Sequence, residues 1–349
     1  MKMKRLQMKK AVLYVLFTLL LSVAGITNAF AQDRIAVLQH DGETQVFYGG
    51  NAFIDAYNAA DTSDVITLSG GEFSCPSIMV KPITIHGAGM CEDSVAMVQR
   101  TILRGVSSSL KFKGGTASNH FIVEGVDFST NTGIFYQECY NAEFNKCLFS
   151  HFTYFSNNDA NSYGFRFTNC RLWSFSFLRA TDVTFVNSVV QEAKMLNHHI
   201  TASDTMIAYN SIIGLQAGIT PCYSNFTNCI INGFENAIPD ASCSLTNCLC
   251  ITNGYGSLLQ NALHVNCMEV ETLEDIFVDF TNNINDPFIL LDEISNSIVG
   301  TDGTQVGIHG GMCPWTDRPN YMIMRRCTVG SRTTDDGHLS VDIEVVTEE

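Results

Sequence analysis

The chain has 349 residues, of which 46% are hydrophobic and 16% charged, and these proportions exclude an intrinsically disordered protein. Its 20 Lys and Arg stand against 35 Asp and Glu, so the formal net charge is −15. Nucleic acids and anionic membrane surfaces are bound through clustered Lys and Arg, and we therefore expect neither as a partner. The length allows one large domain or two ordinary ones.

The first 31 residues have the pattern of a signal peptide. A basic stretch over residues 2–10 precedes an apolar run from Ala11 to Val23, and Ala29-Phe30-Ala31 fits the small-x-small cleavage rule. The apolar run is short for a membrane span, although an uncleaved anchor is the alternative. Cleavage before Gln32 removes five Lys and Arg and no acid, which leaves 15 basic against 35 acidic residues, a net charge of −20. We expect an exported protein, periplasmic, at the cell surface or extracellular, with no membrane insertion after cleavage.

A helix and several short strands are predicted next. Residues 51–60 place Phe53, Ala56, Tyr57 and Ala60 on one helical face, with Asn51 as the candidate N-cap. We expect this helix to cover the first coil of the fold. Short strands rich in Val, Ile and Leu follow over residues 65–68, 83–86, 101–105 and 123–128.

From residue 144 a unit of about 20 residues recurs. Each unit is a short strand rich in Phe, Val, Ile and Thr, which ends in Asn followed by Cys or Ser, except that Lys146 takes the Asn position in the first unit. The Cys or Ser falls at positions 147, 170, 188, 211, 229, 248 and 267, six steps that cover 120 residues. No helical pattern separates the units, and the Leu spacing of leucine-rich repeats is missing. Like residues that recur at like positions predict an all-β fold, a parallel β-helix of about ten coils.

Two columns of this repeat predict its interior. The bend after Phe167 must let both Phe167 and Leu172 face inward, and Asn tolerates the left-handed conformation that this needs. We predict an internal ladder in which each Asn bonds its copies above and below, at positions 169, 187, 210, 228, 247 and 266. The Cys column shares its place with Ser188 and Ser211, which predicts small buried thiols that are not cross-linked. Disulfide bonds between cysteines outside this column stay open, and the candidate pairs are Cys222 with Cys243, Cys75 with Cys91 and Cys313 with Cys327.

The C-terminal residues are expected to form two strands. Residues 321–329 and 339–346 flank the turn at Asp336-Gly337, and they predict a closing hairpin or a small appended module. The chain is accordingly divided into a signal peptide (1–31), a β-helix with an N-terminal cap (32–311) and a C-terminal strand pair (312–349).

Two segments resemble the right-handed parallel β-helix, pectin-lyase-like proteins that Gram-negative bacteria export. Residues 52–89 are similar to the start of that superfamily, with a capping helix, a strand, a Gly turn and an apolar strand before Gly-x-Gly. Residues 301–311 resemble its Asp-Gly-Thr…Gly-x-Tyr-Gly-Gly ending, with His309 where Tyr is more usual. The resemblance covers about residues 45–311. It implies the fold but no single activity, because the superfamily includes lyases, hydrolases, esterases and adhesins.

No catalytic motif of that superfamily is recognisable, so no catalytic residue and no cofactor are assigned. The strongest polar cluster comprises Arg179, Asp182, Glu192, Lys194, His198 and His199. Arg179 and His199 are one repeat apart, so Lys194 or a His could act as a base while Arg179 neutralises a uronate. Solvated turn residues are the alternative. A calcium site stays open at an acidic run that comprises Glu269, Glu271, Glu274, Asp275 and Asp279. The alternative is that these residues form a solvated loop face.

Two further predictions concern surface residues. Trp173 and Tyr154 are the aromatic residues most worth inspecting for exposure, since sugars stack on exposed rings. Glu143 and Arg166 stand at the same place in successive units and are expected to stack as a surface ion pair.

The function favoured by these patterns is a non-catalytic carbohydrate-binding or surface-contact module, with a polysaccharide or cell-surface glycan as its partner. The missing motifs support this function, and a charge of −20 repels polyuronates at long range. A polysaccharide lyase or glycoside hydrolase with an atypical active site is the alternative, and a purely structural envelope role is a third.

Overall fold

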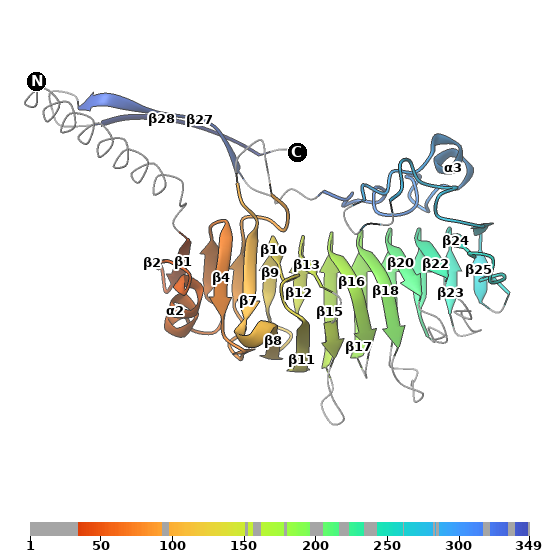
Figure 1. The fold of residues 1–349 in the computed structure, drawn as a ribbon, viewed down its shortest axis with the longest axis horizontal. Coiled ribbons are helices and arrows are strands. Elements are labelled where there is room, and N and C mark those ends of the chain that lie inside the picture. Colours follow the sequence, from red (N-terminus) through yellow and green to blue (C-terminus); the bar gives the residue numbers. More distant parts are fainter. Residues whose placement is uncertain are drawn as a thin grey trace, which may run out of the picture.

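The computed structural model shows an elongated solenoid of stacked strands (Figure 1). It describes residues 34–92, 98–150, 153–155, 162–177, 180–195, 205–215, 223–233, 243–260, 262–281, 283, 286–316, 322–333 and 339–347. The predicted signal peptide lies outside the described residues.

The N-terminal end of the solenoid is covered by a hairpin and a helix. Strands β1 (Ile35–His40) and β2 (Glu43–Tyr48) pair antiparallel, and β1 also pairs antiparallel with β3 (Val65–Leu68). Helix α2 (Ala52–Ala59) confirms the predicted helix and buries Phe53, Ala56 and Tyr57. Asn51 occupies the N-cap position but makes no side-chain capping hydrogen bond.

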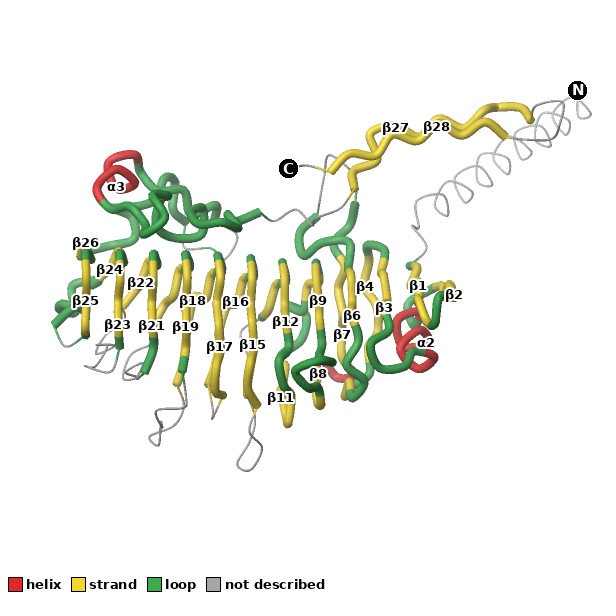
Figure 2. The backbone as a smooth tube through the Cα atoms, turned by 180° about the vertical axis from the view of Figure 1, so that it is seen from behind, coloured by secondary structure: helices red, strands yellow, loops and turns green. Residues whose placement is uncertain are grey.

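Two sheets run the length of the molecule, as Figure 2 shows. Sheet A begins with β2, β1 and β3. It continues through β6 (Thr84–His86), β9 (Ile122–Glu124), β12 (Glu143–Asn145), β15 (Ser162–Thr168), β17 (Ala180–Val186), β19 (Met206–Tyr209), β21 (Asn225–Thr227), β23 (Ser244–Thr246) and β25 (Leu263–Val265).

Sheet B packs opposite sheet A across the solenoid interior. Its main path is β4 (Gly71–Cys75), β7 (Thr101–Gly105), β10 (Val126–Asp127), β13 (Leu148–Phe149), β16 (Arg171–Phe177), β18 (Val189–Met195), β20 (Ile212–Leu215), β22 (Ile230–Gly233), β24 (Leu249–Ile251) and β26 (Met268–Val270). A branch adds β5 (Ile78–Met79), β8 (Ser109–Gly114), β11 (Gly133–Cys139) and β14 (Thr153–Phe155), and a short 3-10 helix spans Val106–Ser108.

The fold is a right-handed parallel β-helix, which confirms the predicted fold class. It has about seven turns, a minor difference from the ten or so predicted. One coil is long, since Ile85 pairs with Val123 and the step takes 38 residues. Residues 271–316 leave the stack after β26.

The interior follows the predicted columns. Phe144, Phe167 and Phe185 are buried and stack on successive coils, with ring centroids 5.3 and 5.2 Å apart. All six Asn of the repeat have left-handed φ angles, between 46° and 55°, which confirms the bend. Phe167 and Leu172 on either side of it are fully buried, as that bend requires.

The Cys and Ser column forms a ladder inside the coils. The Cys170 N–H donates to Ser188 Oγ (3.0 Å), the Ser188 N–H donates to Ser211 Oγ (3.1 Å), and each hydroxyl donates in turn to a backbone carbonyl two residues earlier. The cysteines of this column are thiols, four of them buried and Cys267 half-buried, as predicted. Cys75 is likewise a free thiol, so the pairing with Cys91 is not formed, and Cys313 is a free and exposed thiol. Cys222 lies outside the described residues.

The C-terminal strand pair is also confirmed. Strands β27 (Met322–Thr333) and β28 (Leu339–Thr347) form an antiparallel two-stranded sheet of their own. Across the described residues, no helix is long and apolar enough to cross a membrane.

Candidate functional site

Residues 271–316, called the strap below, fold back over the outer face of sheet B. They contain helix α3 (Asp292–Ser297) and lie along the upper edge of the solenoid in Figure 1. An outward-facing column of sheet B is apolar, in register from Val189 through Ile212 and Ile230 to Leu249. These four residues are buried in a second hydrophobic core to which the strap contributes Ile276, Phe277, Phe288, Leu290, Ile298, Val306 and Ile308.

The Asn column holds the strap by its backbone. Asn187 Nδ2 donates to the carbonyls of Ile308 (2.8 Å) and Gly310 (2.7 Å), and the Thr301 N–H donates to Asn228 Oδ1 (2.9 Å). Asn247 Nδ2 donates to the Val299 carbonyl (2.9 Å).

The predicted internal ladder is therefore wrong in its position and partners. These Asn side chains point outward toward the strap; Asn187 and Asn228 are buried, and Asn247 is half-buried. One ladder bond of the predicted kind exists, from Asn266 Nδ2 to Asn247 Oδ1 (3.1 Å).

The Asp-Gly-Thr…Gly-Gly segment of the strap lies close against the Asn column. Asp302 Oδ1 accepts hydrogen bonds from the backbone N–H and the hydroxyl of Thr304, which lower the pKa of the Asp302 carboxyl. Thr304 Oγ1 in turn accepts the Gly311 N–H (2.7 Å). Gly311 has φ +80°, and a Cβ there would lie 2.9 Å from Asn210 Cγ, so a side chain would push the strap off the solenoid.

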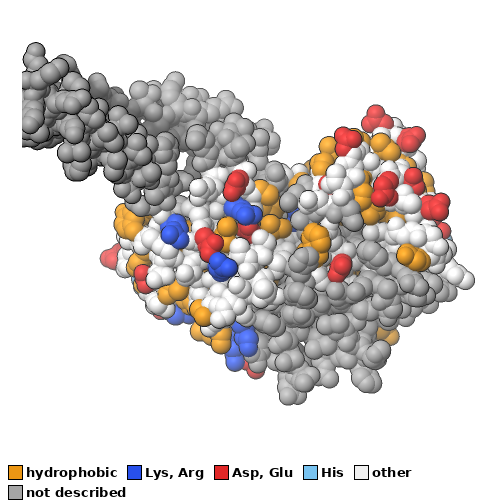
Figure 3. Space-filling model, viewed as in Figure 1, with side chains coloured by type: hydrophobic (Ala, Val, Ile, Leu, Met, Phe, Trp, Pro, Cys, Tyr) orange, Lys and Arg blue, Asp and Glu red, His pale blue; other side chains and the backbone are white. Residues whose placement is uncertain are grey.

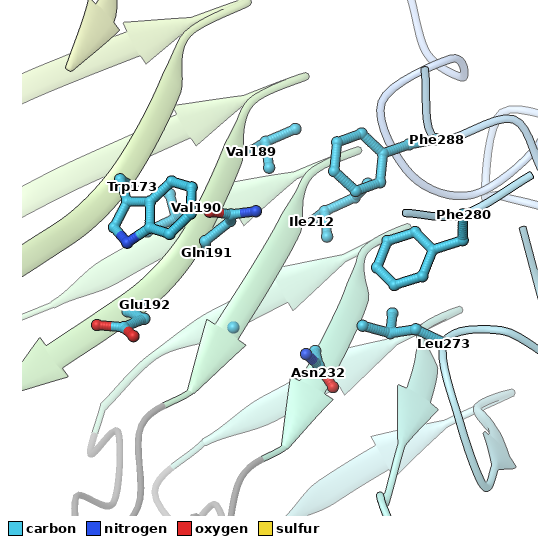
Figure 4. A pocket seen from close by; sticks show the side chains of 11 residues that line it. Trp173, Val189, Val190, Gln191, Glu192, Ile212, Asn232, Leu273, Phe280 and Phe288 are labelled. Carbon is cyan, nitrogen blue, oxygen red and sulfur yellow. The ribbon is translucent and has the colours of Figure 1, made fainter. Parts of the chain in front are cut away.

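A groove of about 210 Å³ lies between the strap and sheet B (Figure 4). The sheet contributes Trp173 from β16, Gln191 and Glu192 from β18, and Asn232 from β22. The strap contributes three apolar side chains on the facing side, Leu273, Phe280 and Phe288.

A β-bulge builds the polar side of this groove. Val190 pairs with Ile213 and Ala193 pairs with Leu215, so Gln191 and Glu192 together oppose the single residue Gly214. A Cβ on Gly214 would lie 1.9 Å from the Gln191 carbonyl oxygen, so the residue opposite the bulge must be Gly. A bulge interrupts the alternation of a strand and redirects its side chains, and here two consecutive polar residues line the same groove.

The groove combines three kinds of contact. The half-buried Trp173 offers an indole face, the Gln191 and Asn232 side chains offer amide donors and acceptors, and Glu192 offers a carboxylate. Glu192 is the one carboxylate among the eleven described lining residues. Hydrolysis of a glycosidic bond by the usual mechanism needs two carboxyl groups about 5–9.5 Å apart. The described lining residues offer stacking and hydrogen-bonding groups.

The charge around the groove is acidic. Figure 3 shows Asp and Glu side chains gathered over the strap around α3, and the exposed acids of this segment include Glu274, Asp279, Asp292 and Glu293. Glu274 and Asp279 are next in sequence to Leu273 and Phe280 of the apolar wall, and they make the approach to the groove unfavourable for anionic ligands.

The predicted polar cluster stays a prediction, because four of its six side chains are not described. Asp182 lies in β17 of sheet A, where its Oδ1 accepts a hydrogen bond from Thr205 Oγ1 (3.0 Å), whereas Glu192 lies in β18 of sheet B. The backbone of Lys194 belongs to β18, and the place of its side chain is not described. Arg179, His198 and His199 lie outside the described residues.

The remaining predicted surface residues have separate outcomes. Trp173 is half-buried and lines the groove, whereas the side chain of Tyr154 is not described. Glu143 and Arg166 do lie in register on β12 and β15, but the Glu143 carboxylate pairs with His120 Nε2 at 3.5 Å.

Two members of the acidic run hold local loop structure. Glu269 Oε1 accepts a hydrogen bond from Ser257 Oγ (2.8 Å), and Asp275 Oδ2 accepts one from Thr272 Oγ1 (2.9 Å). Within the described ranges, no group of three or more His, Cys, Asp or Glu side chains is placed to hold a metal ion.

Comparison with known proteins adds no assignment, since no family model, no curated protein and no solved structure matches the chain.

Proposed function

We propose that this protein is an exported glycan-binding protein and that the groove between sheet B and the strap holds an uncharged sugar chain. The observation that carries the proposal is the combination of one half-buried indole with amide and carboxylate groups on a bulge that faces an apolar wall. Aromatic faces stack on the C–H side of sugar rings, while amides and carboxylates accept and donate hydrogen bonds at the edges, where hydroxyl groups lie.

The size and charge of the groove limit the kinds of ligand that it can hold. A volume of about 210 Å³ is below the roughly 300–1,000 Å³ of pockets that enclose drug-sized ligands. It fits one or two sugar units of a longer chain that continues into solvent. Glu192 is the one charged side chain among the described residues that line the groove, and exposed acids lie on the strap beside it. Binding of a uronate or a sulfated sugar is therefore disfavoured.

The test is binding of neutral and acidic polysaccharides to residues 32–349, which retain every described element. Titration is followed by calorimetry and by fluorescence, since the chain has two Trp, Trp173 and Trp315. Release of reducing ends and of unsaturated uronates is recorded in the same samples. We expect binding of a neutral glycan without turnover. Turnover would instead support the lyase or hydrolase alternative.

Two variants locate the site. Trp173→Ala should weaken binding at least about tenfold, equal to about 1.4 kcal/mol, whereas Tyr163→Ala removes an exposed aromatic ring from sheet A and should have no effect. Glu192→Gln should keep the affinity for neutral glycans and raise it for acidic ones, because only the charge is lost. Equal affinities of the wild type and Trp173→Ala would refute the proposed site.

A further inference from the structure

The two ends of the solenoid differ in how they are closed. At the N-terminal end, β2 and helix α2 cover the first coil. At the other end, β25 terminates sheet A and β26 terminates sheet B, and no strand among the described residues pairs with the outer edge of β25. An unpaired edge presents backbone N–H and C=O groups that can pair with another strand.

The last strand of sheet A also has an inverted polarity. In the two preceding coils the inward position is Phe226 and then Leu245, both buried, but in β25 this position is the exposed His264. The outward positions change in the opposite sense, from Ser244 and Thr246 to Leu263 and Val265, which are 66% and 65% exposed.

This inversion separates β25 from an ordinary protected edge. Natural edges are protected by Lys, Pro, bulges or inward-pointing charged residues; β25 has no Lys, Pro or bulge, and its inward position holds His264. His264 is held within its own strand, with Nδ1 3.1 Å from the Ala262 carbonyl oxygen. The two residues beside it instead offer apolar surface to solvent at the very end of the sheet, and such surface marks a contact site.

The sequence of β25 is self-complementary. In an antiparallel pair centred on His264, Leu263 of one copy lies opposite Val265 of the other, and this happens twice because of the two-fold symmetry. The apolar side chains then meet on one face of the new ladder, and the outer-edge backbone groups of both copies are paired. We propose that two copies of this protein join end to end through their β25 edges as a two-fold dimer.

The two-fold contact limits the assembly to two copies, because each copy has one β25 edge and uses it in the pair. At the N-terminal end, sheet A terminates in a different strand, β2, which lies antiparallel on β1 beside α2. The contact area is small and each body is acidic, so we expect a micromolar dissociation constant that decreases when salt screens the repulsion.

Sedimentation equilibrium of residues 32–349 from about 5 to about 200 µM, a range chosen for a small interface, tests the dimer. Leu263→Lys combined with Val265→Lys should raise the dissociation constant at least about tenfold, since like charges then face each other twice. The matched control is Val46→Lys combined with Tyr48→Lys, which adds the same charges to exposed positions on β2, the opposite terminal strand of sheet A. Circular dichroism checks that both variants are folded.

A cross-link reports the register directly. His264→Cys places two thiols on the two-fold axis, where the Cα atoms of an antiparallel pair are about 4.5–5.5 Å apart, within reach of a disulfide. The exposed Cys313 is removed by Cys313→Ser in this variant and in its parent. Oxidation should give a covalent dimer of the His264→Cys variant and none of the parent.

Three results would overturn the proposal. The first is a protein that stays monomeric throughout the concentration range. Protection of the β25 amides in that monomer would show that a segment of the same chain covers the edge. The second is a dimer that the β2 variant disrupts and the β25 variant does not. The third is a dimer without the cross-link at position 264.

Discussion

The attachment of the strap to the Asn column can be tested with one substitution, Asn187→Gly. Asn187 is 1% exposed, and its Nδ2 donates both hydrogen bonds that hold the carbonyls of Ile308 and Gly310. Gly keeps the left-handed φ of 46° without strain, so the substitution removes the hydrogen bonds and leaves the bend in place.

The expected cost follows from the two bonds. Each hydrogen bond contributes about 0.5–1.5 kcal/mol net, and a buried carbonyl left without a donor costs about 1–3 kcal/mol. We therefore expect strap opening to become easier by about 2–4 kcal/mol, which corresponds to roughly 30- to 1,000-fold in the opening equilibrium. The coils beneath have their own ladders and should not be affected.

Native-state hydrogen exchange with mass spectrometry measures this opening. Peptides within residues 298–316 should lose protection in the Asn187→Gly protein, while peptides from β16 and β18 should not. Asn169→Gly is the matched control, because Asn169 has a similar left-handed φ (51°) in the same column but its Oδ1 has no hydrogen-bond partner. If the two variants exchange alike, or if the strap and the coils lose protection together, the Asn column does not hold the strap.

Three smaller predictions concern the core, the bulge and the N-terminal cap. Cys170→Ser should change the free energy of unfolding by less than about 1 kcal/mol, whereas Cys170→Val should destabilise by about 1–3 kcal/mol through overpacking, as denaturant melts would show. Gly214→Ala must displace the Gln191 carbonyl, so calorimetric titration should detect weaker glycan binding even where the melting temperature is kept. The hydrogen bond that His40 Nδ1 donates to the Asp64 carboxylate raises the pKa of His40, so this pair stabilises the fold at acidic pH and loses that contribution as pH rises through the folded pKa. Melting temperatures of His40→Gln should accordingly fall below wild type near pH 5.5 and match it near pH 8.5, values chosen to bracket the ordinary His pKa of about 6.5.

Much of the interior was predictable because a repeat determines one coil and stacking copies it. The left-handed Asn, the buried Phe column and the Cys and Ser ladder all follow from this rule, as Asn169, Phe167 and Cys170 illustrate. The rule does not say what lies outside a coil. The repeat alone therefore predicts that the Asn side chains hydrogen-bond one another. In the structure the strap, which is more than 100 residues away in sequence from Asn187, provides the partners.

A signal for the strap was nevertheless present in the sequence. After five of the seven Cys or Ser, two apolar residues follow in direct succession, as in Val189-Val190, Ile212-Ile213 and Ile230-Ile231. Consecutive apolar residues in a strand indicate burial on both faces, and only one face can point into the coil. The bulge had no comparable signal, because it depends on how Gln191, Glu192 and Gly214 pair between two coils.

The groove and the strap depend on each other, and this gives a prediction that joins stability to binding. One wall of the groove is the sheet with Trp173 and Glu192, and the other is the strap with Phe280 and Phe288, so a ligand between them contacts both walls only when the strap is closed. A ligand that binds only the closed form stabilises it by about 2.7 kcal/mol at a hundred times its dissociation constant. Exchange of residues 298–316 should then slow by roughly 100-fold in the presence of a bound glycan, while exchange of β25 stays unchanged. In Asn187→Gly the same ligand should bind more weakly if the strap is substantially open. A glycan that binds tightly but leaves strap exchange unaltered must occupy another surface, and the groove would then have to be abandoned as its site.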